Sequence, residues 1–167
     1  MRANGGRVGG LGIVTNATGG CLCGDVRYRL RAEPIALYCC HCTECQTTSG
    51  SSFVMALRIP YGGLSVTKGS VRLCERAEAG GIARNVGRCP SCLTALWSER
   101  LEGRAFQTVY AGTLDDSANL QPVAHIWIQD AQPWIRFDER TLRFSQSPPT
   151  MQPIIDVWRQ RQSPKQG

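Results

Sequence analysis

The sequence predicts a single, mainly β domain, and three observations predict it. Short runs that alternate apolar and polar residues recur along the chain, Gly, Pro, Asn or Asp stands between most of them, and helical patterns are confined to two short segments. The length of 167 residues fits one domain. A composition of 42% hydrophobic and 19% charged residues is typical of a globular chain with its own core.

We divide the chain into a flexible lead over residues 1–16, a domain over residues 17–146 and a tail with a short helix over residues 147–167. The first 20 residues hold seven glycines and little pattern. We therefore expect ordered structure to begin near Thr18.

The first long strand is expected to follow Cys23. Val26, Tyr28 and Leu30 alternate with arginines there, so the apolar side chains share one face of an extended segment. Further strands are expected over Ser52–Ile59, Leu64–Thr67, Val71–Glu75, Gly81–Val86, Ala95–Ser98, Phe106–Ala111 and Val123–Ile128, and helices over Thr43–Ser49 and Pro153–Gln162. Short strands separated by turns predict an assembly of antiparallel sheets, to which the C-terminal helix is an accessory.

The charge pattern gives little support to a nucleic-acid partner. The formal net charge is +6, but the 19 lysines and arginines are spread along the chain without a basic run. Arg27, Arg29 and Arg31, like Arg159 and Arg161, are interpreted as solvated faces of a strand and a helix. An anionic small substrate is compatible with the same charge. No apolar stretch approaches the roughly 20 residues that span a bilayer, so no membrane partner is expected.

The nine cysteines indicate metal binding. The chain lacks the pattern of an export signal, which predicts a cytoplasmic location, and disulfides rarely persist in that reducing compartment. Seven cysteines form three tight groups, which are Cys21 with Cys23, Cys40 with Cys42 and Cys45, and Cys89 with Cys92. Cys74 stands apart and is interpreted as a small buried hydrophobe.

The first and last groups together predict a structural zinc site. Two thiolates on one tight turn can reach the same ion, and zinc in structural sites takes four such ligands. Cys89 and Cys92 supply half of the set, and Cys21 and Cys23 are the natural complement. Such a site would close a long loop and stabilise a small β core.

The middle group, Cys40, Cys42 and Cys45, leaves a tetrahedral zinc one ligand short. Catalytic zinc keeps such an open position, which a water or a substrate thiol can fill, so thiol chemistry is the natural hypothesis. The alternative is a second closed structural site, with His41 or Cys39 as its fourth ligand.

With these groups placed, the chain resembles the family of glutathione-dependent formaldehyde-activating enzymes, which shares its domain with centromere protein V. The resemblance covers about residues 17 to 137. It rests on the motifs Gly20-Cys-Leu-Cys-Gly-Asp-Val-Arg-Tyr28, Cys40-His-Cys-Thr-Glu-Cys45 followed by Ser49-Gly50 and Phe53, Cys89-Pro-Ser-Cys92, Gly112-Thr-Leu-Asp-Asp116 and His125-Ile-Trp127.

The resemblance implies β sheets folded over like a tent and two zinc sites. The structural zinc would be held by Cys21, Cys23, Cys89 and Cys92. A second, more labile zinc on Cys40, Cys42 and Cys45 would be the centre at which formaldehyde condenses with glutathione. The chain departs from the family pattern at Arg88, where an aromatic residue is usual, at Leu93, where glycine is usual, and at Ser51, where a small residue such as alanine often stands.

Three polar residues outside the cysteine groups are further candidates. Asp115, Asp116 and His125 belong to types that move protons. A turn role for the two aspartates and a hydrogen-bonded place on a sheet for His125 explain them better. Trp97, Trp127 and Trp134 are interpreted as core or pocket wall.

The sequence thus predicts a zinc-dependent carbon–sulfur lyase-like enzyme whose reactive zinc lies on Cys40, Cys42 and Cys45. Its partner would be a small thiol such as glutathione, whose carboxylates Arg27 or Arg58 would hold by charge complementarity. The alternative is a non-catalytic zinc-binding module that binds a macromolecular partner.

Overall fold

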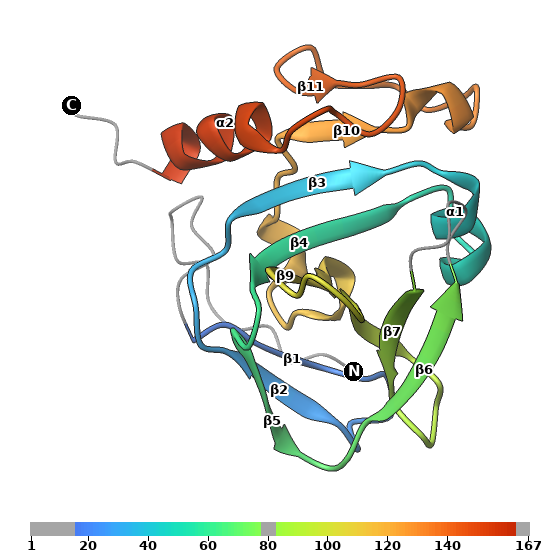
Figure 1. Ribbon diagram of the computed structural model, residues 1–167, viewed down its shortest axis with the longest axis vertical. Helices are drawn as coiled ribbons and strands as arrows, with labels where there is room; N and C mark the ends of the chain where they lie inside the picture. The colour runs from blue at the N-terminus through green and yellow to red at the C-terminus, as the bar shows by residue number, and fades with distance from the viewer. Residues whose placement is uncertain (1–15, 78–82, 163–167) are drawn as a thin grey trace.

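The computed structural model describes residues 16–77 and 83–162, and the predicted flexible lead therefore lies almost wholly outside the described residues. The protein is mainly β with a short C-terminal helix, as predicted. The strands of the described residues form two sheets, one of three strands in the order β1-β2-β5 and one of eight strands in the order β11-β10-β3-β4-β9-β8-β7-β6. Figure 1 shows β10 and β11 at the top of the domain, β3 and β4 crossing beneath them, β6 and β7 at the right side, and β1, β2 and β5 at the bottom.

Eight of the described strands agree closely with the predicted segments, whereas β1, β3 and β11 were not predicted. Their bounds are β1 Thr18–Gly20, β2 Arg27–Leu30, β3 Ala36–Cys40, β4 Val54–Pro60, β5 Leu64–Lys68, β6 Arg72–Ala77, β7 Ala83–Arg88, β8 Ala95–Arg100, β9 Phe106–Tyr110, β10 Ala124–Ile126 and β11 Leu142–Arg143. The described part of the chain also contains three short 3₁₀ turns, η1 Ala111–Thr113, η2 Ser117–Asn119 and η3 Ile128–Asp130.

The sequence analysis did not predict β3, which occupies an interior position of the large sheet. All five of its residues are buried, so it lacks the alternation that reveals a half-exposed strand. It pairs antiparallel with β4 on one side and parallel with β10 on the other. The parallel pairs of β10 with β3 and β11 are the exceptions to the expected antiparallel arrangement among the described strands.

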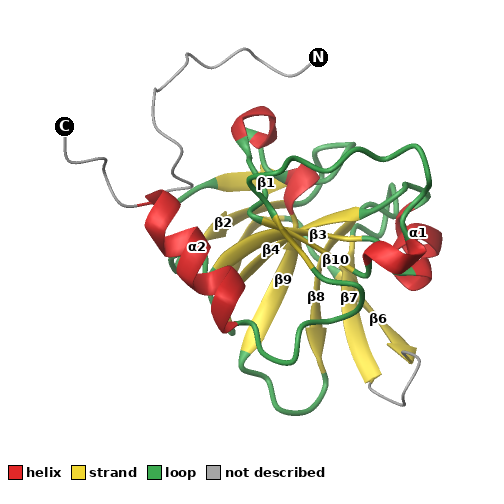
Figure 2. Ribbon diagram, turned by 90° about the horizontal axis from the view of Figure 1, so that it is seen from above, coloured by secondary structure: helices red, strands yellow, loops and turns green. Residues whose placement is uncertain are grey.

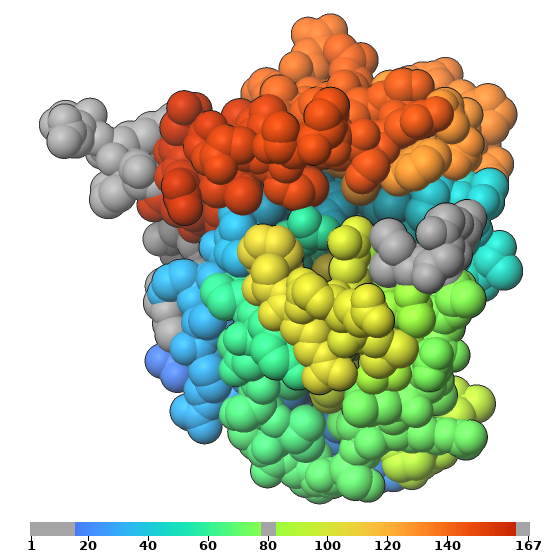
Figure 3. All heavy atoms as spheres, in the orientation of Figure 1, coloured from blue at the N-terminus to red at the C-terminus, as the bar shows by residue number. Residues whose placement is uncertain are grey.

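Two helices flank the sheets at opposite ends (Figure 2). Helix α1, Thr43–Ser49, begins at Cys42, whose sulfur accepts a bond from the Cys45 N–H, and ends at Gly50 with a φ of 64°. The positive φ explains the glycine, because other residues are strained there. Helix α2, Gln152–Gln162, buries its apolar face against β3. Figure 3 shows the C-terminal segment lying across the top of the domain.

The small sheet is tied to the segment that follows β9. Tyr28 of β2 is fully buried, and its hydroxyl bonds to Thr113 Oγ1 at 2.7 Å. Gly19 on β1 leaves room for that tyrosine, because a Cβ at this position would lie 2.4 Å from its hydroxyl oxygen. No helix in residues 16–77 and 83–162 is long and apolar enough to cross a membrane.

Candidate metal centres

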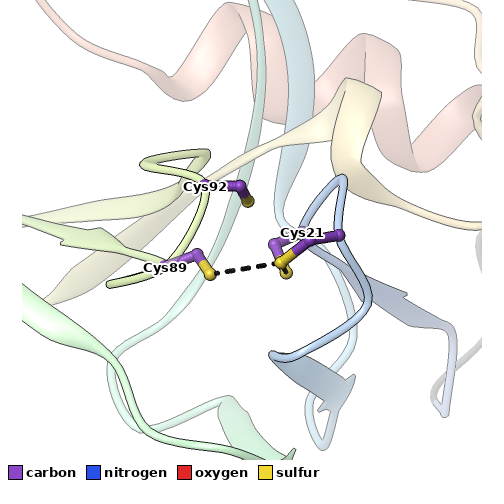
Figure 4. Close-up of side chains that lie close together, drawn as sticks. Cys21, Cys89 and Cys92 are labelled. Carbon is purple, nitrogen blue, oxygen red and sulfur yellow. Dashed lines mark hydrogen bonds between the residues drawn. The ribbon is translucent and has the colours of Figure 1, made fainter.

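Four cysteines meet where the two sheets approach each other. Cys21 follows β1 in a tight turn closed by the bond from the Gly24 N–H to its carbonyl, and Cys89 and Cys92 lie on the turn between β7 and β8. Figure 4 shows Cys89 and Cys92 on that turn with their side chains directed toward Cys21. The fold therefore brings the pair Cys21 and Cys23 next to the pair Cys89 and Cys92, the combination that the sequence predicts.

The sulfur positions suit a tetrahedral metal ion. The four ligand atoms lie within 4.8 Å of one another, with Cys21 and Cys23 sulfurs 3.4 Å apart and Cys23 and Cys89 sulfurs 3.7 Å apart. Zn–S bonds of about 2.3 Å on a tetrahedron place sulfurs roughly 3.8 Å apart, whereas a disulfide requires about 2.05 Å. The set is thus arranged for metal rather than for disulfides.

Local hydrogen bonds favour the ionised form of two of these thiols, Cys92 and Cys21, whereas the pKa of Cys23 is raised to about 12, with a backbone bond at Asp25 outweighed by burial and the bonds to the other thiols. The hydroxyl and backbone of Thr94 lower the pKa of Cys92 to about 5. Burial opposes ionisation of Cys21, but the Val26 N–H at 3.2 Å from its sulfur and the neighbouring thiols bring its pKa below the usual value. Zinc binds thiolates, so the lowered pKa values of Cys21 and Cys92 favour metal binding at this site.

The turn between β7 and β8, which carries Cys89 and Cys92, contains one residue with a strained backbone conformation. Leu93 has a φ of 61°, a conformation that favours glycine, and its side chain is 60% exposed. Its N–H bonds to the Cys89 carbonyl at 3.0 Å, so the turn keeps its shape without the glycine. The departure from the family pattern at this position therefore leaves the four cysteines together.

The second cluster joins the end of β3 to the start of α1. The sulfurs of Cys40, Cys42 and Cys45 lie within 4.8 Å of one another, and Cys40 and Cys42 sulfurs are 3.5 Å apart. Cys42 accepts hydrogen bonds from the other two thiols and from backbone N–H groups of α1, which holds its pKa far below the usual value. These three donors fit a soft metal ion such as zinc.

Neither alternative fourth ligand belongs to this cluster. Cys39 and Cys40 are neighbours on a strand and therefore point to opposite faces, and burial raises the pKa of Cys39 to about 12. The ring of His41 turns instead to His125, with 3.0 Å between Nε2 and Nδ1. Aromatic rings of Phe53 and Phe137 pack around the pair. His125 is thus a hydrogen-bonded residue of the sheet.

The buried histidine pair makes stability depend on pH. Burial, His41 and Arg143 lower the pKa of His125 to about 4, below the unfolded value near 6.5. The unfolded chain therefore takes up the proton first, and stability falls as pH drops from about 6.5 to 4, by roughly 2 to 3 kcal/mol. Urea unfolding should show this loss in the wild type and a shallower one in His125→Gln. Equal slopes would contradict the prediction.

The two aspartates have structural partners away from both clusters. Asp115 forms a two-pronged ion pair with Arg27 and accepts a bond of 2.6 Å from the Thr18 hydroxyl. Asp116 accepts a bond of 2.7 Å from the Asn119 side chain. The turn role expected for these residues agrees with these contacts.

The described residues line a cavity of about 500 Å³. It borders Cys92 of the first cluster and the end of α1, the helix that carries Cys45. Its walls include Thr48, Ser49, Phe53, Arg88, Leu93 and Tyr110. Neither Arg27 nor Arg58, the arginines proposed to hold a substrate, lines it. Arg58 lies over the rings of Tyr38 and Phe106, at 5.7 and 5.2 Å from their centroids.

Sequence reasoning missed the residue that fixes the second cluster's loop. The Gln46 amide donates to the carbonyls of His41 and Asp130, at 2.6 and 2.8 Å, and accepts from Gln132. Its position directly after Cys45 was the available signal. The contacts tie the ligand loop to the segment that follows β10.

Comparison with known proteins places the chain in a family. The family described as glutathione-dependent formaldehyde-activating enzyme matches residues 16–130. No curated protein matches the chain. Among solved structures, a Rhodobacter sphaeroides protein is similar, with 15% identity and a TM-score of 0.48 over 76% of this chain and 98% of that one. The family match spans both cysteine clusters and most of the chain, and the protein belongs to the glutathione-dependent formaldehyde-activating enzyme family.

Proposed function

We propose that the protein is a zinc-dependent carbon–sulfur lyase-like enzyme that acts on the adduct of formaldehyde with a small thiol. One observation carries this proposal. Cys40, Cys42 and Cys45 form a group of three ligands, and no fourth His, Cys, Asp or Glu from the described part of the chain belongs to it. Structural zinc takes four protein ligands, whereas catalytic zinc keeps a position for water or substrate.

Glutathione is the thiol that we propose, because the family to which the chain belongs is described by it. The thiol sulfur bonds to the carbonyl carbon of formaldehyde, and the thiol proton ends on the carbonyl oxygen, which gives S-hydroxymethylglutathione. The reverse reaction breaks the same carbon–sulfur bond. When bound at Cys40, Cys42 and Cys45, zinc supplies stabilisation of the thiolate and Lewis-acid polarisation of the carbonyl.

The residues around the cavity have separate tasks in this proposal. The cavity removes the thiol and formaldehyde from bulk water and orients them. Burial raises the pKa of Tyr110, so its hydroxyl stays protonated at neutral pH and can donate a hydrogen bond to the developing oxygen. Free thiol clusters persist in a reducing compartment, which is why we also propose a cytoplasmic location.

Cys42→Ser tests the proposal while preserving the helix start. Serine is a favourable N-cap, so α1 keeps its first hydrogen bond while the metal loses a thiolate ligand. We expect zinc to fall from two ions per chain to one, and acceleration of adduct formation to fall to the uncatalysed background. Exchange spectroscopy by NMR on formaldehyde and glutathione measures the rate, and mass spectrometry measures the zinc.

Cys74→Ser is the matched control, since Cys74 belongs to neither cluster, and it should keep both zincs and full activity. Wild-type activity in Cys42→Ser would refute the proposed centre. Two zincs that glutathione does not disturb, with no acceleration in the wild type, would favour a non-catalytic zinc module instead.

A further inference from the structure

Five arginines gather on one face of the large sheet. Arg72 on β6 lies directly opposite Arg88 on β7, Arg76 lies opposite Arg84, and Arg84 in turn lies opposite Arg100 on β8. Residues opposite each other project to the same face, as do residues two and four apart along one strand. We call these five residues the arginine ladder.

This arrangement concentrates positive charge at a cost to the fold. Like charges directly opposite each other destabilise a strand pair, and the ladder contains three such pairs. Glu44 lies 3.9 Å from Arg76 and offsets part of the charge. Arg88 donates to the Leu93 carbonyl at 3.0 Å, which orients its guanidinium but leaves its charge in place. Arg88 therefore brings a positive charge to the wall of the cavity that it lines.

The register places the arginine ladder on the same face as the second cysteine cluster. Arg100 shares a face with Ser98, which lies opposite Thr108 of β9. Two residues further, Tyr110 lies opposite Ala56, and Ala56 lies opposite Tyr38 of β3. Cys40 follows two residues after Tyr38 and therefore projects to this face as well.

The arginine ladder and helix α1 both contribute residues to the wall of the cavity. Arg88 lines it directly. Thr48 also lines it, and the Thr48 hydroxyl accepts a bond of 2.7 Å from Arg76. Phe53 and Leu93 supply apolar wall. A small molecule in this cavity would thus lie against apolar side chains, with Arg88 and the end of α1 also in its wall.

We propose that the arginine ladder is an anion-binding wall, with Arg88 as its carboxylate anchor, and that it selects thiol substrates bearing two carboxylates over neutral thiols. Guanidinium groups bind carboxylates by charge-assisted, often two-pronged hydrogen bonds. A one-signed wall in a cleft also raises the local concentration of an anion. This inference rests on the proposed function in one respect, namely that the thiol sulfur of the bound substrate points toward Cys40, Cys42 and Cys45.

S-methylglutathione separates the two proposals, because it keeps both carboxylates but has no free thiol. Calorimetric titration of the zinc-loaded protein should show binding that weakens as salt rises. Arg88→Gln should weaken it tenfold or more. Arg100→Gln removes an exposed charge further along the ladder and should weaken it less. The matched control is Arg29→Gln, an exposed arginine on the small sheet, which should bind as the wild type does.

Kinetics test the selection between thiols. Arg88→Gln should raise KM for glutathione at nearly constant kcat and leave KM for β-mercaptoethanol unchanged. A merely structural role of Arg88 would change both thiols alike, and circular dichroism checks that the variant is folded. Wild-type affinity of Arg88→Gln for S-methylglutathione would overturn the inference, even if the enzyme makes the formaldehyde adduct.

Two other outcomes are decisive. Binding of S-methylglutathione that depends on Arg88, in a protein without formaldehyde chemistry, would support the anion wall and refute the proposed function. Tight binding of a DNA duplex that Arg72→Gln and Arg100→Gln abolish, without any binding of S-methylglutathione, would overturn the small-molecule assignment.

Discussion

Cys89→Ser is expected to leave the protein unfolded at room temperature. Cys89 is fully buried, and its sulfur lies 3.7 Å from that of Cys23, a residue 66 positions earlier in the chain. The four-cysteine site joins the turn after β1 to the turn between β7 and β8, and hence the small sheet to the large one.

The magnitudes explain the size of this effect. A structural zinc contributes about 10 to 16 kcal/mol of apparent binding free energy, whereas a whole domain is stable by only about 5 to 15 kcal/mol. Loss of one thiolate leaves three ligands and an open metal position. Other polar contacts of the small sheet with the rest of the domain include the Tyr28 hydroxyl bond and the partly exposed Arg27–Asp115 ion pair, each worth only about 1 kcal/mol.

Thermal melting by circular dichroism and zinc analysis would check this prediction. The wild type and Cys74→Ser should both melt cooperatively with two zincs, and a strong chelator should reproduce the loss seen in Cys89→Ser. If the metal-free wild type melted at the same temperature as the zinc-loaded protein, the site would have no stabilising role.

Trp158→Ala is expected to cost about 3 to 5 kcal/mol of unfolding free energy. Trp158 is 4% exposed, and its indole N–H donates to the buried Pro34 carbonyl at 3.1 Å. The substitution removes the largest buried side chain of α2 and leaves that carbonyl without its partner. Because α2 covers β3, the damage reaches the strand that ends in Cys40.

Two further tryptophan variants isolate the cause. Trp158→Phe keeps most of the packing and loses only the hydrogen bond, so about 1 to 2 kcal/mol should be lost. Trp134→Ala removes a side chain that is 64% exposed and should change stability by less than about 0.5 kcal/mol. Urea unfolding measures all three, and similar losses for Trp158→Ala and Trp134→Ala would contradict this account of α2.

Local patterns made most of the strands and both cysteine clusters predictable. Cys40, Cys42 and Cys45 lie within six residues, so the chain itself holds them near each other wherever the segment folds. The pairing of Cys21 and Cys23 with Cys89 and Cys92 followed from the number of ligands that zinc takes, a chemical rule that does not require the fold. The strand β3 was not predicted, because a fully buried strand lacks the alternation of apolar and polar residues that reveals a strand in the sequence.

The sequence by itself determined the mainly β class, the C-terminal helix, the two thiol clusters and the family. Only the tertiary structure decided that His41 faces His125, that Arg27 is held by Asp115, and that five arginines without a basic run share one face of the large sheet, with Arg88 lining the cavity. The physical reason is the distance along the chain over which each kind of information acts. Ligand spacing and side-chain alternation act over a few residues, whereas strand register, set by packing of the whole sheet, decides which distant side chains share a face.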